Sequence, residues 1–187
     1  MGLTISNNST FDNVKLFDLN HFQDARGDLS ELYRFSKFSN IPYWKNFEIK
    51  QINLVNSIKG TIRGFHKYSP PNEQDKVLLC IRGSIRDVLL DCNPISKTFG
   101  KTKRFELSAD KPQLLLIPGG LAHAFQTLSS NSLIMYAFNF EYSPEFEINI
   151  NPLEGELAEN WINKRIVSEK DRSALSFQNF IKLVSPH

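Results

Sequence analysis

Short strand-like segments follow one another at close, regular intervals through the middle of the chain, and this spacing constrains the fold more than any other feature. Strands about 8–12 residues apart, with turn residues between them, are typical of sandwiches and barrels. No long helical run separates successive segments, which disfavours a parallel β/α sheet. The expected strands are Phe47–Val55, Lys76–Ile81, Ser84–Asp91 after an Arg82-Gly83 turn, Lys103–Leu107, Gln113–Ile117 and Ser132–Phe140.

The C-terminal part has a different pattern. Ser168 can cap a helix, because an acidic residue, Asp171, follows three positions later. The apolar residues after it recur at helical spacing: Leu175, Phe177, Phe180, Ile181 and Val184. The 187 residues are therefore expected to form a single domain, with a β core over about residues 14–150 and a helical segment over about 157–187.

Composition excludes several classes of protein. The 22 basic and 20 acidic side chains nearly balance, which gives no support to a nucleic-acid binder. No apolar stretch of about 20 residues predicts a membrane span. Met1–Asn13 is polar and has no apolar signal core. Cys80 and Cys92 lie in apolar runs without a CxxC motif, which predicts buried thiols and a cytoplasmic protein.

Two of the four histidines lie in informative sequence. His66 follows Arg63 and precedes a lysine, and such cationic neighbours suit an anionic ligand. A regular strand would send Arg63 and His66 to opposite faces, but Gly64 between them can mark a bulge that brings both to one pocket. His123 is the other candidate, and a structural role is the alternative for both. His21 and His187 lie in polar or terminal sequence and are weak candidates.

The segment Pro118-Gly-Gly-Leu-Ala-His123 resembles the second motif of the cupin superfamily, whose members are small β-barrels with an internal site. In metal-binding cupins that histidine is a ligand, and the first motif supplies a His-x-His pair. Here the corresponding segment reads His66-Lys67-Tyr68, so the second histidine is missing. Two imidazoles without a carboxylate make a poor zinc site, so no metal is expected.

An ordered series of segments resembles the dTDP-4-dehydrorhamnose 3,5-epimerase family, the sugar-nucleotide epimerases of the cupin superfamily. The similarity covers about residues 14–175. It rests on Asp24–Gly27, Ile62–His66, Gln74–Lys76, Arg82–Asp91, Thr98–Gly100, Glu106–Ala109, Ile117–Phe125, Tyr136, Tyr142–Glu145 and Ser168–Asp171.

The resemblance implies a mostly β, cupin-type jelly-roll barrel with short C-terminal helices, and a homodimer without metal or organic cofactor. Its implied substrate is a nucleoside-diphosphate 4-keto-6-deoxy sugar, inverted at C3, C5 or both. In the family pattern His66 matches the catalytic base, Asp171 its partner and Tyr136 the acid. Lys76 completes the expected catalytic set, and the expected substrate contacts are Arg63, His123, Arg26, Glu31, Gln51 and Asn53.

These side chains suit that chemistry. Lys76 can stabilise the enolate that forms when His66 removes a proton beside the ketone. Tyr136 can return a proton on the opposite face, and Arg63 with Arg26 can hold the diphosphate. Each assignment has an alternative: Asp171 as a helix cap, Tyr136 as a core residue and Lys76 as a solvated charge.

Three other functions stay open. A ketoisomerase of dTDP-sugars and a non-catalytic sugar-nucleotide-binding cupin would share the barrel, and a metal-dependent cupin is the third. The N-terminal strand Val14–Leu19 is expected to pair across the dimer interface, because an uncovered edge strand is a liability.

Overall fold

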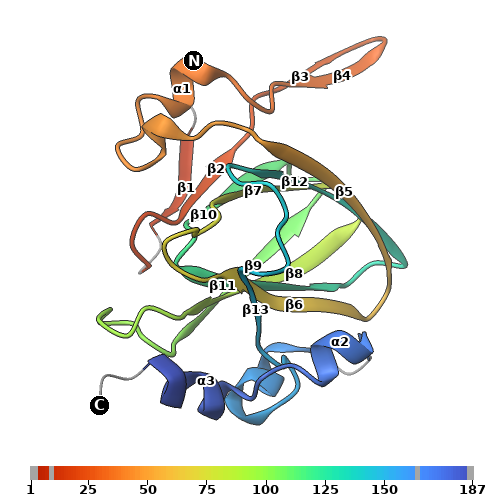
Figure 1. Ribbon diagram of the computed structural model, residues 1–187. Helices are drawn as coiled ribbons and strands as arrows, with labels where there is room; N and C mark the ends of the chain where they lie inside the picture. Colours follow the sequence, from red (N-terminus) through yellow and green to blue (C-terminus); the bar gives the residue numbers. More distant parts are fainter. Residues whose placement is uncertain (1–3, 9–10, 163–164, 185–187) are drawn as a thin grey trace.

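Two sheets face each other and form the barrel (Figure 1). The computed structural model describes residues 4–8, 11–162 and 165–184. The first sheet has the order β1 (Thr4–Asn8), β2 (Lys15–Asp18), β10 (Gln113–Ile117), β7 (Lys76–Arg82), β12 (Asn131–Phe138) and β5 (Gln51–Ile58). The second has the order β13 (Glu147–Asn149), β6 (Thr61–Tyr68), β11 (Leu121–Thr127), β8 (Ser84–Asp91) and β9 (Thr102–Ser108).

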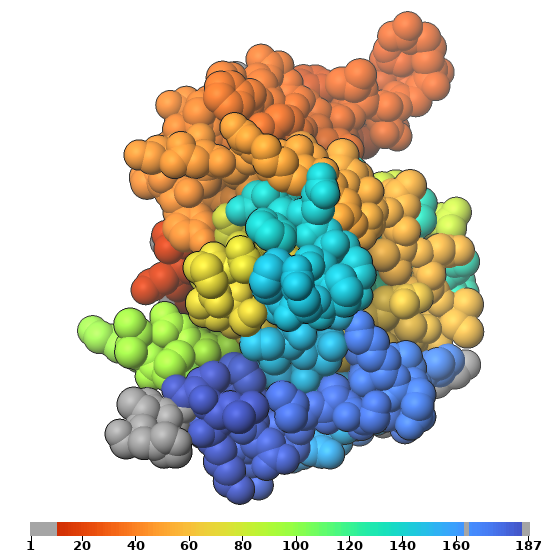
Figure 2. Space-filling model, viewed as in Figure 1, coloured from red at the N-terminus to blue at the C-terminus, as the bar shows by residue number. Residues whose placement is uncertain are grey.

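The remaining elements decorate this barrel. β14 (Ile166–Val167) adds to β6 in parallel, and β3 (His21–Asp24) forms a separate hairpin with β4 (Gly27–Ser30). Figure 2 shows this hairpin projecting from the body of the molecule. The helical elements are α1 (Phe35–Phe38), η1 (Trp44–Asn46), η2 (Gly155–Asn160), α2 (Glu169–Arg172) and α3 (Phe177–Val184). None of the helices in the described residues is long and apolar enough to span a membrane.

Apolar side chains pack in three layers. One layer lies between the sheets, where Leu78 and Leu89 are fully buried. A second lies under the C-terminal segment, where α3 lies against the outer face of the second sheet (Figure 1) and Phe180 is buried with Phe65 and Val88. A third lies under the N-terminal segment, around Trp44. β10 is covered on both faces, so all of Gln113–Ile117 is buried. Its sequence is therefore continuously apolar from Leu114 to Ile117 rather than alternating.

The predicted mostly β class is confirmed. β8 and β10 have the predicted bounds, and a turn at Gly83, with φ of 76°, separates β7 from β8. The predicted short C-terminal helices are also confirmed, as α2 and α3. The break between them falls at Leu175, whose backbone bonds to the segment after β13: the Asn151 N–H donates to the Leu175 carbonyl at 2.8 Å. His187 and the end of the predicted helical segment lie outside the described residues.

The expectation that Val14–Leu19 pairs across a dimer interface is wrong. β2 already has a neighbour on each side within the chain, because it pairs with β1 through Phe17↔Ile5 and with β10 through Phe17↔Leu114. A strand with both edges occupied cannot add a third neighbour in the same sheet.

Candidate active site

A cavity of about 360 Å³ opens between the two sheets and is bordered by the C-terminal segment. Its walls come from β5, β7 and β12 of one sheet and from β6, β11 and β13 of the other, with α2 at one side. Eight of the ten predicted site residues line it: Gln51, Asn53, Arg63, His66, Lys76, His123, Tyr136 and Asp171.

An irregularity in β6 brings Arg63 and His66 to the same cavity. Gly64 between them has φ of 111°, and a Cβ built there would lie 2.4 Å from the His123 carbonyl oxygen. The pairing of β6 with β11 shifts register at the same place, between His123 and Phe125. The predicted bulge is therefore present, and only glycine fits this conformation and this close approach.

His66 and Asp171 form a hydrogen-bonded pair, with 2.7 Å between Nε2 and Oδ1. α2 presents Asp171 to the cavity, and Ser168 caps this helix by accepting a hydrogen bond from the Asp171 N–H at 3.1 Å. The cap is thus the serine hydroxyl, which leaves the Asp171 carboxylate free to bind the imidazole. The proposed alternative role of Asp171 as the cap does not match this geometry.

The charges of this pair favour an ionised carboxylate. Burial alone raises the pKa of Asp171, but hydrogen bonds from His66 and Ser168 and the charge of His66 outweigh burial and hold that pKa below its ordinary value. An ionised carboxylate only accepts, so His66 Nε2 carries the hydrogen, and in the neutral form of the imidazole the lone pair is on Nδ1. The imidazole is about one-third exposed and can receive a proton from a ligand in the cavity.

Tyr136 is buried beside His123, with the two rings edge to face at 5.6 Å between centroids. Burial, together with the charge of Asp87, raises the pKa of the Tyr136 phenol well above its ordinary value. The group is therefore a neutral donor near pH 7. His123 Nε2 lies 2.6 Å from Asp87 Oδ2, and burial lowers the pKa of this imidazole despite the neighbouring carboxylate.

Lys76 is a buried cation at the start of β7. Its Nζ donates a hydrogen bond to the His66 carbonyl oxygen at 3.0 Å. Burial lowers the pKa of Lys76 to about 8, while the charges of Asp87 and Glu147 act in the opposite direction. The ammonium group is thus charged at neutral pH but desolvated, which strengthens its interaction with a negative oxygen.

Polar groups at the cavity mouth come from distant segments. Gln51 donates to Asn53 at 2.9 Å and accepts from the Tyr142 N–H at 2.7 Å. Glu147 on β13 binds the Lys170 ammonium of α2 at 2.6 Å. This ion pair ties the C-terminal segment to the barrel beside Asp171.

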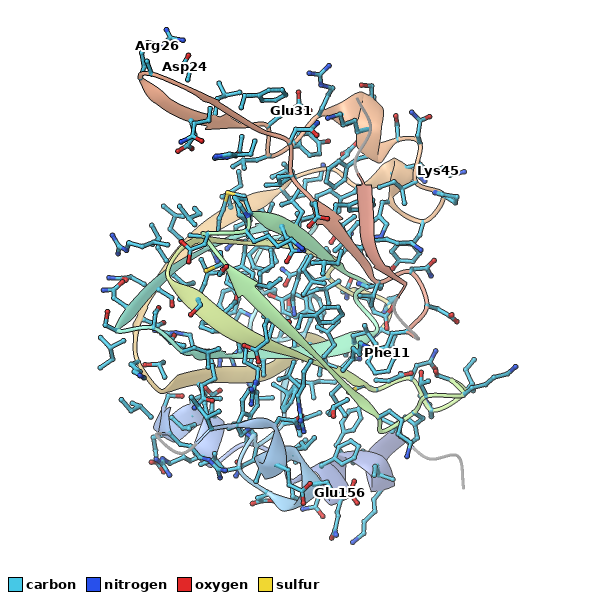
Figure 3. The ribbon with its side chains drawn as sticks, turned by 180° about the vertical axis from the view of Figure 1, so that it is seen from behind. Phe11, Asp24, Arg26, Glu31, Lys45 and Glu156 are labelled. Atoms are coloured by element: carbon cyan, nitrogen blue, oxygen red, sulfur yellow. The ribbon has the colours of Figure 1, made fainter. Side chains whose placement is uncertain are left out.

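Two predicted substrate contacts do not line the cavity of their own chain. Arg26 lies at the tip of the β3–β4 hairpin, where its exposed guanidinium binds Asp24 (Figure 3). Glu31 follows the hairpin and binds Arg34 and Lys37. Arg63 and Arg26 of one chain therefore do not converge on a diphosphate, and this part of the sequence prediction is wrong within a single chain.

Sequence reasoning missed three residues at the site: Asp87, Glu147 and Lys170. Asp87 had a detectable signal, because it stands between Ile85 and Leu89 at alternate positions of β8, where the pattern favours an apolar side chain. The pairing of Glu147 with Lys170 left no signal in the sequence, because it depends on how the C-terminal segment folds back onto the barrel. Within the described residues, no three or more His, Cys, Asp or Glu side chains form a group that could hold a metal ion.

Comparisons with known proteins agree on one family. A family model described as dTDP-4-dehydrorhamnose 3,5-epimerase matches residues 8–179. The Escherichia coli K12 enzyme of that name is 32% identical, over 92% of this chain and 94% of the relative. A Streptomyces dTDP-4-dehydro-6-deoxyglucose 3-epimerase is 30% identical, over 81% and 78% of the two chains.

A solved structure gives the same result. It is dTDP-6-deoxy-D-glucose-3,5-epimerase from Legionella pneumophila in complex with dTDP-4-keto-L-rhamnose, with a TM-score of 0.84 and 28% identity over 95% of this chain and 93% of that chain. The jelly-roll barrel predicted from the sequence is confirmed by this match. Because the family match spans nearly all of the barrel and the C-terminal segment that carries Asp171, the chain belongs to the dTDP-4-dehydrorhamnose 3,5-epimerase family and is an epimerase of dTDP-linked sugars.

Proposed function

We propose that this enzyme inverts C3, C5 or both centres of a dTDP-linked 4-keto-6-deoxy sugar by removing a proton on one face and returning one on the other. The observation that carries the proposal is that the His66–Asp171 pair and the buried phenol of Tyr136 line the same cavity. A base and an acid in one site are what an inversion through an enolate requires.

His66 acts first in this scheme. Its Nδ1 takes the proton from the carbon beside the C4 ketone, and the electron pair of the broken C–H bond moves into the enolate, with charge on the C4 oxygen. Asp171 stabilises the imidazolium that forms and fixes the tautomer that leaves Nδ1 available. The distance of 2.7 Å from Asp171 Oδ1 to Nε2 supports this role.

Lys76 is proposed to stabilise the enolate oxygen. A hydrogen beside a ketone becomes acidic only if the developing negative charge is stabilised. The buried ammonium of Lys76, anchored to the His66 carbonyl, can supply a positive donor next to the base without prior reorganisation. Arg63, exposed at the cavity and held by Ser57 at 3.1 Å, is proposed to contact the diphosphate.

Tyr136 completes the inversion by donating its hydroxyl proton to the carbon, so the enolate electrons form the new C–H bond and the ketone is restored. The raised pKa of the phenol keeps this proton in place until the enolate forms. His66 then loses its proton and Tyr136 regains one through exchange with water, so each inverted centre carries a hydrogen that derives from solvent.

We also propose a homodimer in which each hairpin serves the site of the other subunit. The outward face of β5, an end strand of the first sheet, carries Ile52, Leu54 and Ile58, each between 57% and 64% exposed. Such an exposed apolar stripe on an end strand is suited to burial against a second copy. A hairpin that reaches a second subunit would let Arg26 and Glu31 contact the nucleotide, which their position in their own chain does not allow.

The function is tested by proton NMR in deuterium oxide with dTDP-4-keto-6-deoxyglucose and related 4-keto sugars. Epimerisation predicts deuterium at each inverted centre and a changed coupling pattern of the ring protons. A ketoisomerase would move the carbonyl to a neighbouring carbon, and a non-catalytic binder would leave every C–H bond unlabelled. Either of the last two results would overturn the proposal.

A further inference from the structure

An unusual cluster of hydrogen bonds surrounds Asp75, the residue directly before Lys76. Its Oδ1 accepts from the Tyr43 hydroxyl and from the Gly119 N–H, both at 2.9 Å. Its Oδ2 accepts from Asn139 Nδ2 at 2.9 Å, and its own N–H donates to Asn139 Oδ1 at 2.8 Å. Four groups from three other segments of the chain thus converge on one residue.

The cluster lies where the strand that carries Lys76 would otherwise be free to fray. Lys76 forms the last pair of β7 with both neighbours, opposite Ile117 of β10 and opposite Phe138 of β12. Beyond that pair a long backbone hydrogen bond still joins the Asn139 N–H to the Asp75 carbonyl at 3.4 Å. Strand ends open more easily than strand centres. Asp75 bonds to the residues just past each neighbour, Gly119 and Asn139, and so extends the connection by side-chain contacts.

The turn that contains Gly119 packs closely against Glu73 and Gln74, the residues before Asp75. A Cβ at Gly119 would lie 2.7 Å from the Glu73 Cβ and 2.8 Å from the Gln74 N atom. The β10–β11 turn therefore presses directly on the segment that leads into Lys76. No ion pair of Asp75 occurs among the described residues, and neutral donors satisfy the carboxylate. Its hydrogen bonds thus fix position rather than neutralise a charge.

We propose that Asp75 is a positioning residue that holds Lys76 of β7 and Tyr136 of β12 at a fixed separation on the same wall of the cavity. This inference rests on the proposed function, because it matters for catalysis only if those two side chains act on the substrate. Asn139, three residues after Tyr136, is the second half of the connection. A small displacement between an oxyanion donor and an acid is costly because catalysis depends on their alignment.

The reciprocal nature of the Asp75–Asn139 contact gives a sharp test. Asp75→Asn places two amide donors face to face, and Asn139→Asp places two carboxylates face to face. In the double variant Asp75→Asn/Asn139→Asp every donor again faces an acceptor. The amide oxygen at position 75 still accepts from Tyr43 and Gly119, and its amide nitrogen donates to the new carboxylate at position 139. Asp110→Asn, in an exposed turn, is the control of the same chemistry.

The experiment measures kcat and KM for a dTDP-4-keto-6-deoxy sugar, together with the melting temperature of each variant. Each single change is expected to lower kcat about 10- to 100-fold with little effect on KM, and the double variant is expected to recover most of the loss. Asp110→Asn should match the wild type. Tyr43→Phe, which removes one contact at a part-exposed site, should give a smaller loss and replaces any single variant that fails to fold.

Two results would overturn the inference. One is a lower melting temperature in the single variants with unchanged kcat, which would mean that Asp75 only stabilises the fold. The other is a double variant that regains its melting temperature but not its kcat. Failure of the proposed function is distinct from both, because the wild type itself would then leave the sugar unchanged.

Discussion

Asp171 and His66 are 105 residues apart in the chain, yet their side chains meet at 2.7 Å inside the barrel. The carboxylate comes from a four-residue helix and the imidazole from a barrel strand, so the C-terminal segment completes the site. The proposed base and its partner therefore meet only when that segment docks against the second sheet.

Asp171→Asn should lower kcat about 10²- to 10⁴-fold, the range for loss of an acid–base function. The amide preserves the size of the side chain and the Ser168 cap, but it no longer stabilises the imidazolium. Steady-state kinetics and dTDP binding by calorimetry measure the effect, and binding should persist. Asp110→Asn is the matched control, and wild-type kcat in Asp171→Asn would contradict the proposed pair.

Lys76 should set an alkaline limit on activity. Its pKa is lowered to about 8, so the ammonium is present below that pH and lost above it. The pH profile of kcat/KM is expected to fall above about pH 8 as the enolate loses its positive donor. Lys76→Arg keeps the charge at all accessible pH values, so its residual activity should lack this limb. If Lys76→Arg shows the same fall in kcat/KM above about pH 8, that fall is caused by the titration of another group.

Gly64→Ala should destabilise the barrel and misplace His66. The added Cβ clashes with the His123 carbonyl oxygen, and the alanine must keep the positive φ of Gly64. The clash and the backbone strain together should lower the free energy of unfolding by about 2–4 kcal/mol. Urea unfolding measures the change. Gly155→Ala is the control, because it also has a positive φ but open space around it and should cost about 1 kcal/mol. Equal losses would show that the close approach at Gly64 is tolerated.

Mixed dimers test whether Arg26 serves the partner's site. A heterodimer of an Arg26→Ala subunit with a His66→Asn subunit should regain about half of the wild-type activity, because one of two symmetric sites then has both side chains. A heterodimer of wild type with the Arg26→Ala/His66→Asn double variant should be nearly inactive. The opposite pair of results would place Arg26 at the site of its own chain.

Much of the barrel could be predicted from local sequence. β8 and β10 match their predicted bounds because their apolar runs are buried by packing from both sides, and this leaves a strong signal. The bulge in β6 could also be predicted, because it needs a glycine, and Gly64 stands between Arg63 and His66. These features depend on nearest neighbours along the chain or on one strand and its direct partners.

Features set by distant packing could not be predicted. The break before α3 depends on a backbone contact between Leu175 and the segment after β13. The position of Arg26 depends on a hairpin that leaves the barrel (Figure 3). The family resemblance supplied the link from His66 to Asp171, but it did not indicate Asp75, whose partners come from three other segments.

The central claim is that His66 and Tyr136 move protons on opposite faces of the sugar, and deuterium exchange in the two single variants tests it most directly. With a dTDP-4-keto-6-deoxy sugar in deuterium oxide, His66→Asn should abolish both exchange and inversion. Tyr136→Phe should retain some exchange, because His66 can still remove a proton and return a deuteron on the same face, but it should form no inverted product. Full epimerisation by Tyr136→Phe, with exchange equal to the wild type, would contradict the two-face mechanism.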